Sequence, residues 1–201
     1  MKKFELTTDT KMLLGRKLFR IKALISFGNV GAGDMGGYIE KEENLSQSGN
    51  AWVYGDARVS GNAKVSGDAE VSGDAKVSGN AEVSGNAWVH GNAWVSGNAK
   101  VSGDAEVSGD AEVYGNAKVS GNAEVSGNAD YATASGFGSE YRTTTFFKLK
   151  NSDEIGVRCG CFYGTLKEFR AKVKETHGES KKAKEYLMLA DLMEYRFLEE
   201  K

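Results

Sequence analysis

The chain has 201 residues, of which 26 are Gly and none is Pro. Its 26 basic and 28 acidic side chains leave a net charge of −2, which argues against a protein that coats nucleic acid electrostatically. No run of about 18 apolar residues is present, and the N-terminal MKKFELTTDTKM lacks the apolar core of a secretory signal. We therefore expect no membrane span and a cytoplasmic location.

Residues 1–47 are predicted to form an N-terminal β cap. Phe4-Glu5-Leu6 and the run from Lys17 to Leu24 show rough strand alternation. An open stack of strands would expose an unpaired edge at each end, and repeat proteins need caps that prevent edge-to-edge growth. The flanking segments of this chain suit that purpose.

The segment Gly31-Ala32-Gly33-Asp34-Met35-Gly36 matches the dinucleotide-binding pattern G-x-G-x-x-G. That pattern requires a helix directly after it, and the residues that follow do not predict one. Gly37, Ile39 and Leu45 already fall in the Gly and Ala registers of the repeat described next. We predict a loop that enters the first coil, and no cofactor.

Residues 48–130 repeat with a strict period of six, as in SGNAWV and SGNAKV, with 14 copies of the Gly and 13 of the Val. In each Ala-x-Val, Ala and Val lie two apart and share the inward side of a short strand. The Gly-Asn or Gly-Asp pair that follows suits a sharp corner with positive φ. Three strands and three corners make a triangular coil of 18 residues, so the 14 hexads predict nearly five stacked coils.

The hexad Val-Ser-Gly-Asn-Ala-Lys resembles the hexapeptide-repeat, left-handed parallel β-helix family, whose loose motif it matches throughout residues 48–130. The resemblance implies a mainly β fold. It also implies an enzymatic alternative, since most hexapeptide β-helices of known activity are acyltransferases, usually trimers with a His general base and an inserted loop. Here the hexads run without insertion and His90 is the only His among them. We predict a non-enzymatic protein with no catalytic residue, with an acyltransferase as the alternative.

Residues 18 apart stack in one column, which defines three outward faces. The first face carries Trp52, Glu70, Trp88, Glu106 and Glu124, and the second carries Arg58, Lys76, Trp94, Glu112 and Asp130. The third face carries Lys64, Glu82, Lys100 and Lys118, which is typical of a solvated surface.

Outward aromatic side chains lie on the first two faces only. Because Trp and Tyr are enriched at interfaces, we predict a binding or self-assembly surface formed by Trp52, Tyr54, Trp88, His90, Trp94 and Tyr114. The alternative is that these rings merely stack on neighbours in the same sheet.

The corner residues and the charge of the repeat predict neither a metal site nor mimicry of DNA. Asn62, Asn80, Asn98 and Asn116 share a column that suits an amide ladder. Stacked Asp corners, such as Asp68 with Asp104, more often accept local hydrogen bonds than bind cations. Residues 48–130 hold 5 basic and 11 acidic side chains, a net charge of −6, but Lys interleaves the carboxylates.

Residues 131–201 are predicted to form a C-terminal α+β cap that also mediates oligomerisation. A hairpin runs from Tyr141 to Lys150 and from Ile155 to Cys161, around a turn at 151–153. The two cysteines, one residue apart, cannot form a disulfide framework. A strand would place the thiols of Cys159 and Cys161 on one side, and two ligands are too few for a metal. We expect reduced, buried cysteines.

Two helices end the chain. Thr165-Leu166-Lys167-Glu168 is a capping box that opens the first, and His177-Gly178 stops it. Ser180 opens the second, which we extend to about Glu200. Its apolar stripe is widened by Met188, Leu189 and Leu192, which predicts a second contact with the coil stack or with another subunit.

The end segments are similar to a family of bacterial and phage-encoded hexapeptide-repeat proteins. The similar stretches are 19–24, 36–46 and 159–165, and the resemblance covers essentially the whole chain. It implies a phage or prophage setting in a bacterial host. We expect a dimer or trimer that binds a host defence protein or a signalling nucleotide as an inhibitor, or that serves as an accessory structural component.

Overall fold

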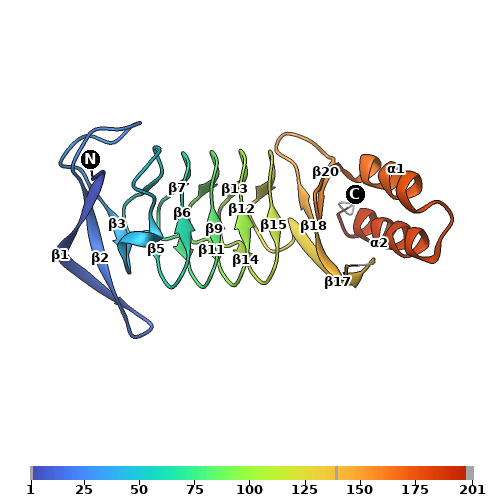
Figure 1. The fold of residues 1–201 in the computed structure, drawn as a ribbon, viewed down its shortest axis with the longest axis horizontal. Helices are drawn as coiled ribbons and strands as arrows, with labels where there is room; N and C mark the ends of the chain where they lie inside the picture. Colours follow the sequence, from blue (N-terminus) through green and yellow to red (C-terminus); the bar gives the residue numbers. More distant parts are fainter. Residues whose placement is uncertain (1, 139, 198–201) are drawn as a thin grey trace.

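The hexapeptide repeat forms a β-solenoid of about five turns in the computed structural model, which describes residues 2–138 and 140–197 (Figure 1). The first face is a parallel sheet of β4 (Trp52–Val53), β7 (Glu70–Val71), β10 (Trp88–Val89), β13 (Glu106–Val107) and β16 (Glu124–Val125). The second contains β5 (Arg58–Val59), β8 (Lys76–Val77), β11 (Trp94–Val95) and β14 (Glu112–Val113). The third contains β6 (Lys64–Val65), β9 (Glu82–Val83), β12 (Lys100–Val101) and β15 (Lys118–Val119).

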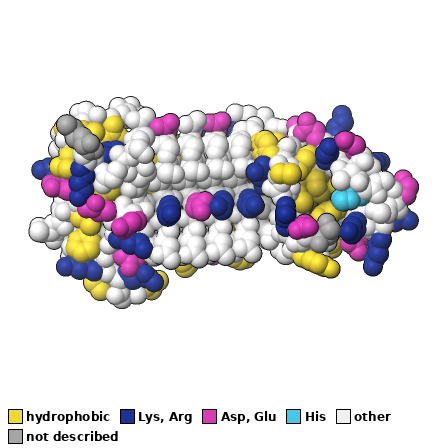
Figure 2. All heavy atoms as spheres, viewed as in Figure 1, with side chains coloured by type: hydrophobic (Ala, Val, Ile, Leu, Met, Phe, Trp, Pro, Cys, Tyr) yellow, Lys and Arg dark blue, Asp and Glu magenta, His cyan; other side chains and the backbone are white. Residues whose placement is uncertain are grey.

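The strand register confirms the predicted stacking of residues 18 apart. Trp88 pairs with Glu70 and Glu106, and Trp94 pairs with Lys76 and Glu112. The inward side chains from Ala51 to Ala123 and from Val53 to Val125 are buried and form one continuous core, whereas Ala129 in the last hexad is exposed. The third face shows a single row of charged side chains along the middle of the solenoid (Figure 2).

The N-terminal segment adds antiparallel strands to the sheet of the second face. β1 (Phe4–Leu13) pairs with β2 (Arg16–Ala23), and β2 pairs with β3 (Met35–Ile39). β3 then pairs in parallel with β5, so the glycine-rich segment leads into a strand, and no dinucleotide-type helix follows it. The short 3₁₀ helix η1 (Glu42–Asn44) comes next, and Leu45 bridges to Val65.

Side-chain donors reach the backbone carbonyls of the first turn, where no earlier turn supplies an N–H. The buried Asn44 amide donates to the carbonyl oxygens of Ala63 at 2.8 Å and Gly61 at 3.1 Å. The buried Lys3 ammonium donates to Ala51 at 2.9 Å and to Gly49 at 3.3 Å. Buried carbonyl groups of this edge are thereby satisfied, as buried polar groups generally must be.

The other end of the solenoid meets a four-stranded antiparallel sheet. Its strands, in order, are β17 (Tyr131–Phe137), β18 (Arg142–Lys148), β19 (Ile155–Cys159) and β20 (Phe162–Thr165). The backbone N–H of Lys118 donates to the Thr145 hydroxyl at 2.9 Å, and Ala123 bridges to Leu149. The sheet therefore continues the hydrogen bonding of the last turn through both side chains and backbone.

The predicted capping box is confirmed and opens α1 (Leu166–His177). The Thr165 hydroxyl accepts from the Glu168 N–H, and the Glu168 carboxylate accepts from the Thr165 N–H. α2 (Lys181–Phe197) follows, and the Ser180 hydroxyl accepts from the Ala183 N–H. Residues 198–200, which the prediction included in this helix, lie outside the described residues.

Both cysteines are free, but the prediction that they are buried on one side of a strand is wrong. Cys159 ends β19, and Cys161 lies in the tight turn before β20, where Gly160 has a φ of 59°. Cys159 is partly exposed and Cys161 is exposed, because the strand reverses between them. Among the described residues, no group of three or more His, Cys, Asp or Glu side chains is arranged as metal ligands would be.

Helices long and apolar enough to cross a bilayer are absent from the part of the chain that the structure describes.

Candidate functional site

Trp52, predicted as an outward interface residue, is a core residue. Its side chain leaves the first face outward, but Phe4 and Phe27 pack edge-on against the indole with ring centroids 6.2 and 5.4 Å away. Only 1% of Trp52 is exposed. Tyr54 is partly buried against the same core. The N-terminal segment thus covers the aromatic side chains of the first turn and removes them from the predicted surface.

Trp88 and Trp94 remain exposed, at 42% and 38%, on the first and second faces. Each indole N–H donates to a Ser hydroxyl of the preceding turn, Trp88 to Ser72 at 3.1 Å and Trp94 to Ser78 at 3.0 Å. Both rings therefore lean one turn toward the N-terminus and are held there. Such rings are pre-organised for contact, since little side-chain freedom is left to lose on binding.

His90 lies against Trp88 and joins a charged cluster. The two rings are stacked, with centroids 3.9 Å apart and an interplanar angle of 26°. His90 Nε2 lies 3.1 Å from Glu106 Oε1, and Lys150 Nζ donates to Glu106 Oε2 at 2.6 Å. The hydrogen bonds from Lys150 and then His90 lower the pKa of Glu106, although burial opposes them. This cluster links the first face to Lys150, in the turn between β18 and β19.

Tyr114 is 61% exposed on the second face, two residues beyond Glu112. The predicted apolar surface of α2 is smaller than expected. Met188 and Leu192 are exposed, at 71% and 57%, but Leu189 is buried in the core that α2 shares with α1 and the sheet. Leu189 is therefore a core residue and not part of a second contact.

A groove that the sequence did not predict lies between the turn of the β1–β2 hairpin and the second face. Its volume is about 640 Å³. The hairpin contributes Leu13, Leu14 and Arg16, and the second face contributes Lys76, Ser78 and Trp94. The remaining wall is formed by residues on either side of a solenoid corner: Glu40, Lys41, Ser60, Gly61, Asn62, Gly79 and Asn80.

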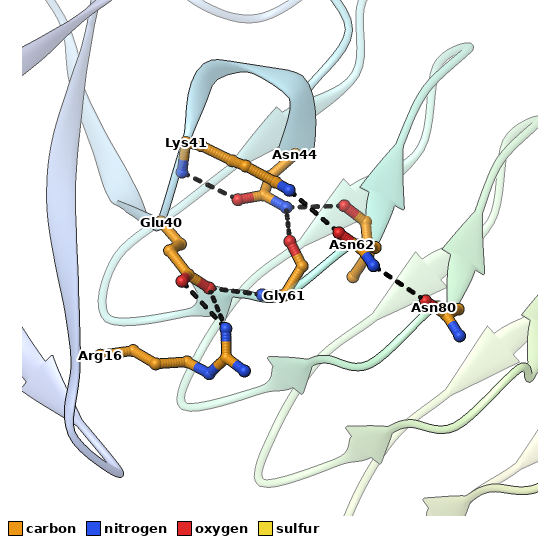
Figure 3. Close-up of polar contacts among 8 residues, drawn as sticks. Arg16, Glu40, Lys41, Asn44, Gly61, Asn62 and Asn80 are labelled. Atoms are coloured by element: carbon orange, nitrogen blue, oxygen red, sulfur yellow. Dashed lines mark hydrogen bonds and ion pairs between the residues drawn. The ribbon is translucent and has the colours of Figure 1, made fainter.

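One wall of the groove is fixed by ion pairs and hydrogen bonds (Figure 3). The Arg16 guanidinium donates to both carboxylate oxygens of Glu40, at 2.9 and 3.0 Å, and the Gly61 N–H donates to Glu40 at 2.6 Å. Burial raises the pKa of Glu40, but the donors from Gly61 and Arg16 outweigh it and hold the pKa below its usual value. Glu40 therefore links the β1–β2 hairpin to the solenoid through hydrogen bonds from Arg16 and Gly61.

The predicted amide ladder borders this wall and is confirmed. Each Asn amide donates to the next side-chain oxygen, from Asn62 to Asn80 at 3.2 Å, Asn80 to Asn98 at 3.0 Å and Asn98 to Asn116 at 3.1 Å. The Lys41 ammonium donates to the Asn62 oxygen at 3.0 Å and begins the row (Figure 3). The ladder makes this corner a rigid edge of the groove.

The sequence model of the YdcK beta solenoid repeat matches residues 51–67 and 75–91. Both stretches lie within the stacked turns, so the repeat found by this sequence model agrees with the strand pairing of the structure. The chain is a β-helix repeat protein. A comparison with curated proteins finds no match.

Proposed function

We propose that the chain is a non-enzymatic binding protein that self-assembles as a dimer or trimer and holds a partner against its outward aromatic side chains. The observation that carries this proposal is the pair Trp88 and Trp94, both exposed and both fixed by a hydrogen bond to the preceding turn. Exposed Trp side chains that are already ordered are typical of residues that dominate binding energy.

The proposed protein is a rigid left-handed hexapeptide β-helix with a triangular cross-section. Three parallel sheets, joined at corners where glycines such as Gly79 have a φ near 70°, support this shape. The contacts of Lys3 and Asn44 with first-turn carbonyls support an N-terminal cap. The Thr145 contact with Lys118 supports a cap built from the C-terminal sheet and its two helices.

The family resemblance supports a prophage or phage setting in the cytoplasm of a bacterial host. The proposed partner there is a host defence protein or its signalling nucleotide, which this protein would sequester as an inhibitor. The alternative to this inhibitor is that the chain serves as an accessory structural protein of a phage. A rigid spacer with two ordered indoles suits either role, because both require a surface that does not rearrange.

The acyltransferase alternative is favoured by one contact. His90 Nε2 lies 3.1 Å from the Glu106 carboxylate, as in a base and the group that orients it. Against it, the His90 ring is stacked on Trp88 and does not line the groove beside Trp94. A general base must reach the proton it abstracts, and the pocket and the imidazole lie on different faces.

Light scattering tests self-assembly. The wild type is expected to have a mass that is a multiple of 21.6 kDa, and Trp88→Ser with Trp94→Ser is expected to reduce it. Lys64→Ser on the third face is the control and should leave the mass unchanged. A monomeric wild type, or an unchanged mass in the double variant, would remove these faces as the interface. Turnover of acetyl-CoA that depends on His90 would replace the binding function with the enzymatic one.

A further inference from the structure

We infer that the groove between the β1–β2 turn and the second face binds a small anion that carries a planar aromatic ring. This inference rests on the proposed binding function and specifies the class of ligand. The shared chemistry is one flat ring and one negative group, which a nucleotide or an aromatic carboxylate can supply. The observations that point to it are the ring of Trp94, the charge of Lys76 and the size of the groove.

Trp94 supplies the surface for the ring. Its indole lines the groove, is 38% exposed and is held by the bond to Ser78. Trp88 makes the same kind of bond to Ser72, but the His90 ring stacks on it. Trp94 thus offers a stacking surface inside a groove, where a planar ligand gains both aromatic contact and loss of water.

Lys76 supplies the charge for the anion. It precedes Trp94 in the column of the second face and lines the same groove. Within residues 2–138 and 140–197, no hydrogen bond or ion pair engages its ammonium group. The other two cations of the groove are engaged, Arg16 by Glu40 and Lys41 by Asn62. Lys76 is therefore the group that can receive a negative ligand without breaking a contact.

The balance of charge in the groove favours an anion. Arg16, Lys41 and Lys76 provide three positive charges and Glu40 one negative charge, which leaves +2. Glu112, the next residue after Trp94 in the column, does not line the groove. This local charge is opposite in sign to the charge of the repeat as a whole, which is −6 from 5 basic and 11 acidic side chains over residues 48–130.

The shape of the groove sets the size of the ligand. Its volume of about 640 Å³ suits a small molecule rather than a folded partner. Leu13 and Leu14 line it from the hairpin side, opposite the second face. Because Leu14 is 88% exposed, a ligand seated under the hairpin would cover apolar surface that is otherwise in water.

Isothermal titration of the full chain tests the inference. The probes are AMP, phenylacetate, adenosine and inorganic phosphate. We expect AMP, phenylacetate or both to bind at least about fivefold more tightly than adenosine and phosphate, since each of these lacks one of the two groups. AMP alone identifies a nucleotide site, and phenylacetate alone identifies a carboxylate site. Equal binding of adenosine, or no binding of AMP and phenylacetate, overturns the inference.

Variants locate the ligand. Trp94→Ala and Lys76→Met are each expected to weaken binding at least about fivefold. The matched controls are Tyr141→Ala, at an exposed aromatic residue outside both aromatic faces, and Lys64→Met on the third face, which should not change it. Binding that is insensitive to Trp94→Ala or Lys76→Met contradicts the inference. A negative result in these titrations does not affect the light-scattering test of self-assembly. The two proposals can therefore fail separately.

Discussion

The ammonium group of Lys3 donates a hydrogen bond of 2.9 Å to the carbonyl oxygen of Ala51, at the start of the first solenoid turn. Lys3 is only 2% exposed and its charge also lies 4.8 Å from the centroid of the Phe27 ring. Burial lowers the pKa of Lys3 from 10.5 to about 8, although the carboxylate of Asp68 opposes the shift. A cation thus takes the place of the missing N–H groups at this edge.

The buried Lys3 predicts a rise in stability at alkaline pH. Between pH 8 and pH 10.5 the unfolded chain keeps the proton of Lys3 while the folded chain has released it. The free energy of unfolding therefore rises with pH across this window. Urea denaturation at several pH values should show a steeper rise for the wild type than for Lys3→Met. Parallel curves for the two proteins would mean that Lys3 is not buried as described.

Glu106 predicts a rise of stability with pH in a second, acid window. Its pKa lies below 4.5 because Lys150 and His90 donate hydrogen bonds to its carboxylate. The stabilisation is present above pH 4.5 and is lost as the pH falls through the lowered pKa. Glu106→Gln should therefore be less stable than the wild type at neutral pH, and the difference should shrink in acid. Lys150→Met should reproduce this trend, whereas a difference constant with pH would contradict it.

Two glycines at equivalent corners separate backbone strain from steric contact. Gly79 and Gly115 have φ values of +70° and +69°, so Ala at either position is strained by about 1 kcal/mol. A Cβ at Gly79 would lie 2.9 Å from the Gly97 carbonyl oxygen, while nothing lies within 4 Å of one at Gly115. Gly79→Ala should cost about 1–3 kcal/mol more than Gly115→Ala in thermal unfolding. Equal losses would mean that the turns are not stacked this closely.

The amide ladder predicts unequal effects for two Asn residues. Asn80 accepts one ladder bond and donates another, whereas Asn116 accepts from Asn98 at the end of the row. Asn80→Ala should lower the free energy of unfolding by about 1 kcal/mol, and Asn116→Ala by about half as much, since these bonds are exposed to water. Urea denaturation measures both. A larger loss for Asn116→Ala would contradict a role for the ladder in stability.

The repeat could be predicted because its rules are local. Ala and Val two residues apart determine the inward side of each strand, and one Gly per hexad determines the corner. The pairing of Trp88 with Glu70 and Glu106 then follows from counting 18 residues in either direction. The ladder from Asn62 to Asn116 follows from the same count.

Which outward side chains are buried by other segments could not be predicted, because this burial depends on contacts between distant parts of the chain. Trp52 follows the same hexad rule as Trp88, yet Phe4 and Phe27 bury it from a segment that lies outside the repeat. Leu189 extends an apolar stripe, but the stripe does not reveal how much of it the sheet covers. The groove beside Trp94 could not be predicted for the same reason. It exists only because the turn after Leu13 lies close to the second face.

Hydroxyl-radical footprinting tests most directly whether the ordered indoles form the contact surface. The oxidation of each aromatic side chain is compared between a dilute sample and the assembled protein. We predict that Trp88 and Trp94 become protected on assembly, while Tyr141, which is 75% exposed and belongs to neither aromatic face, stays reactive. Trp52 should be unreactive in both samples. Equal oxidation of Trp88 and Trp94 in the two samples would contradict the proposed use of these faces.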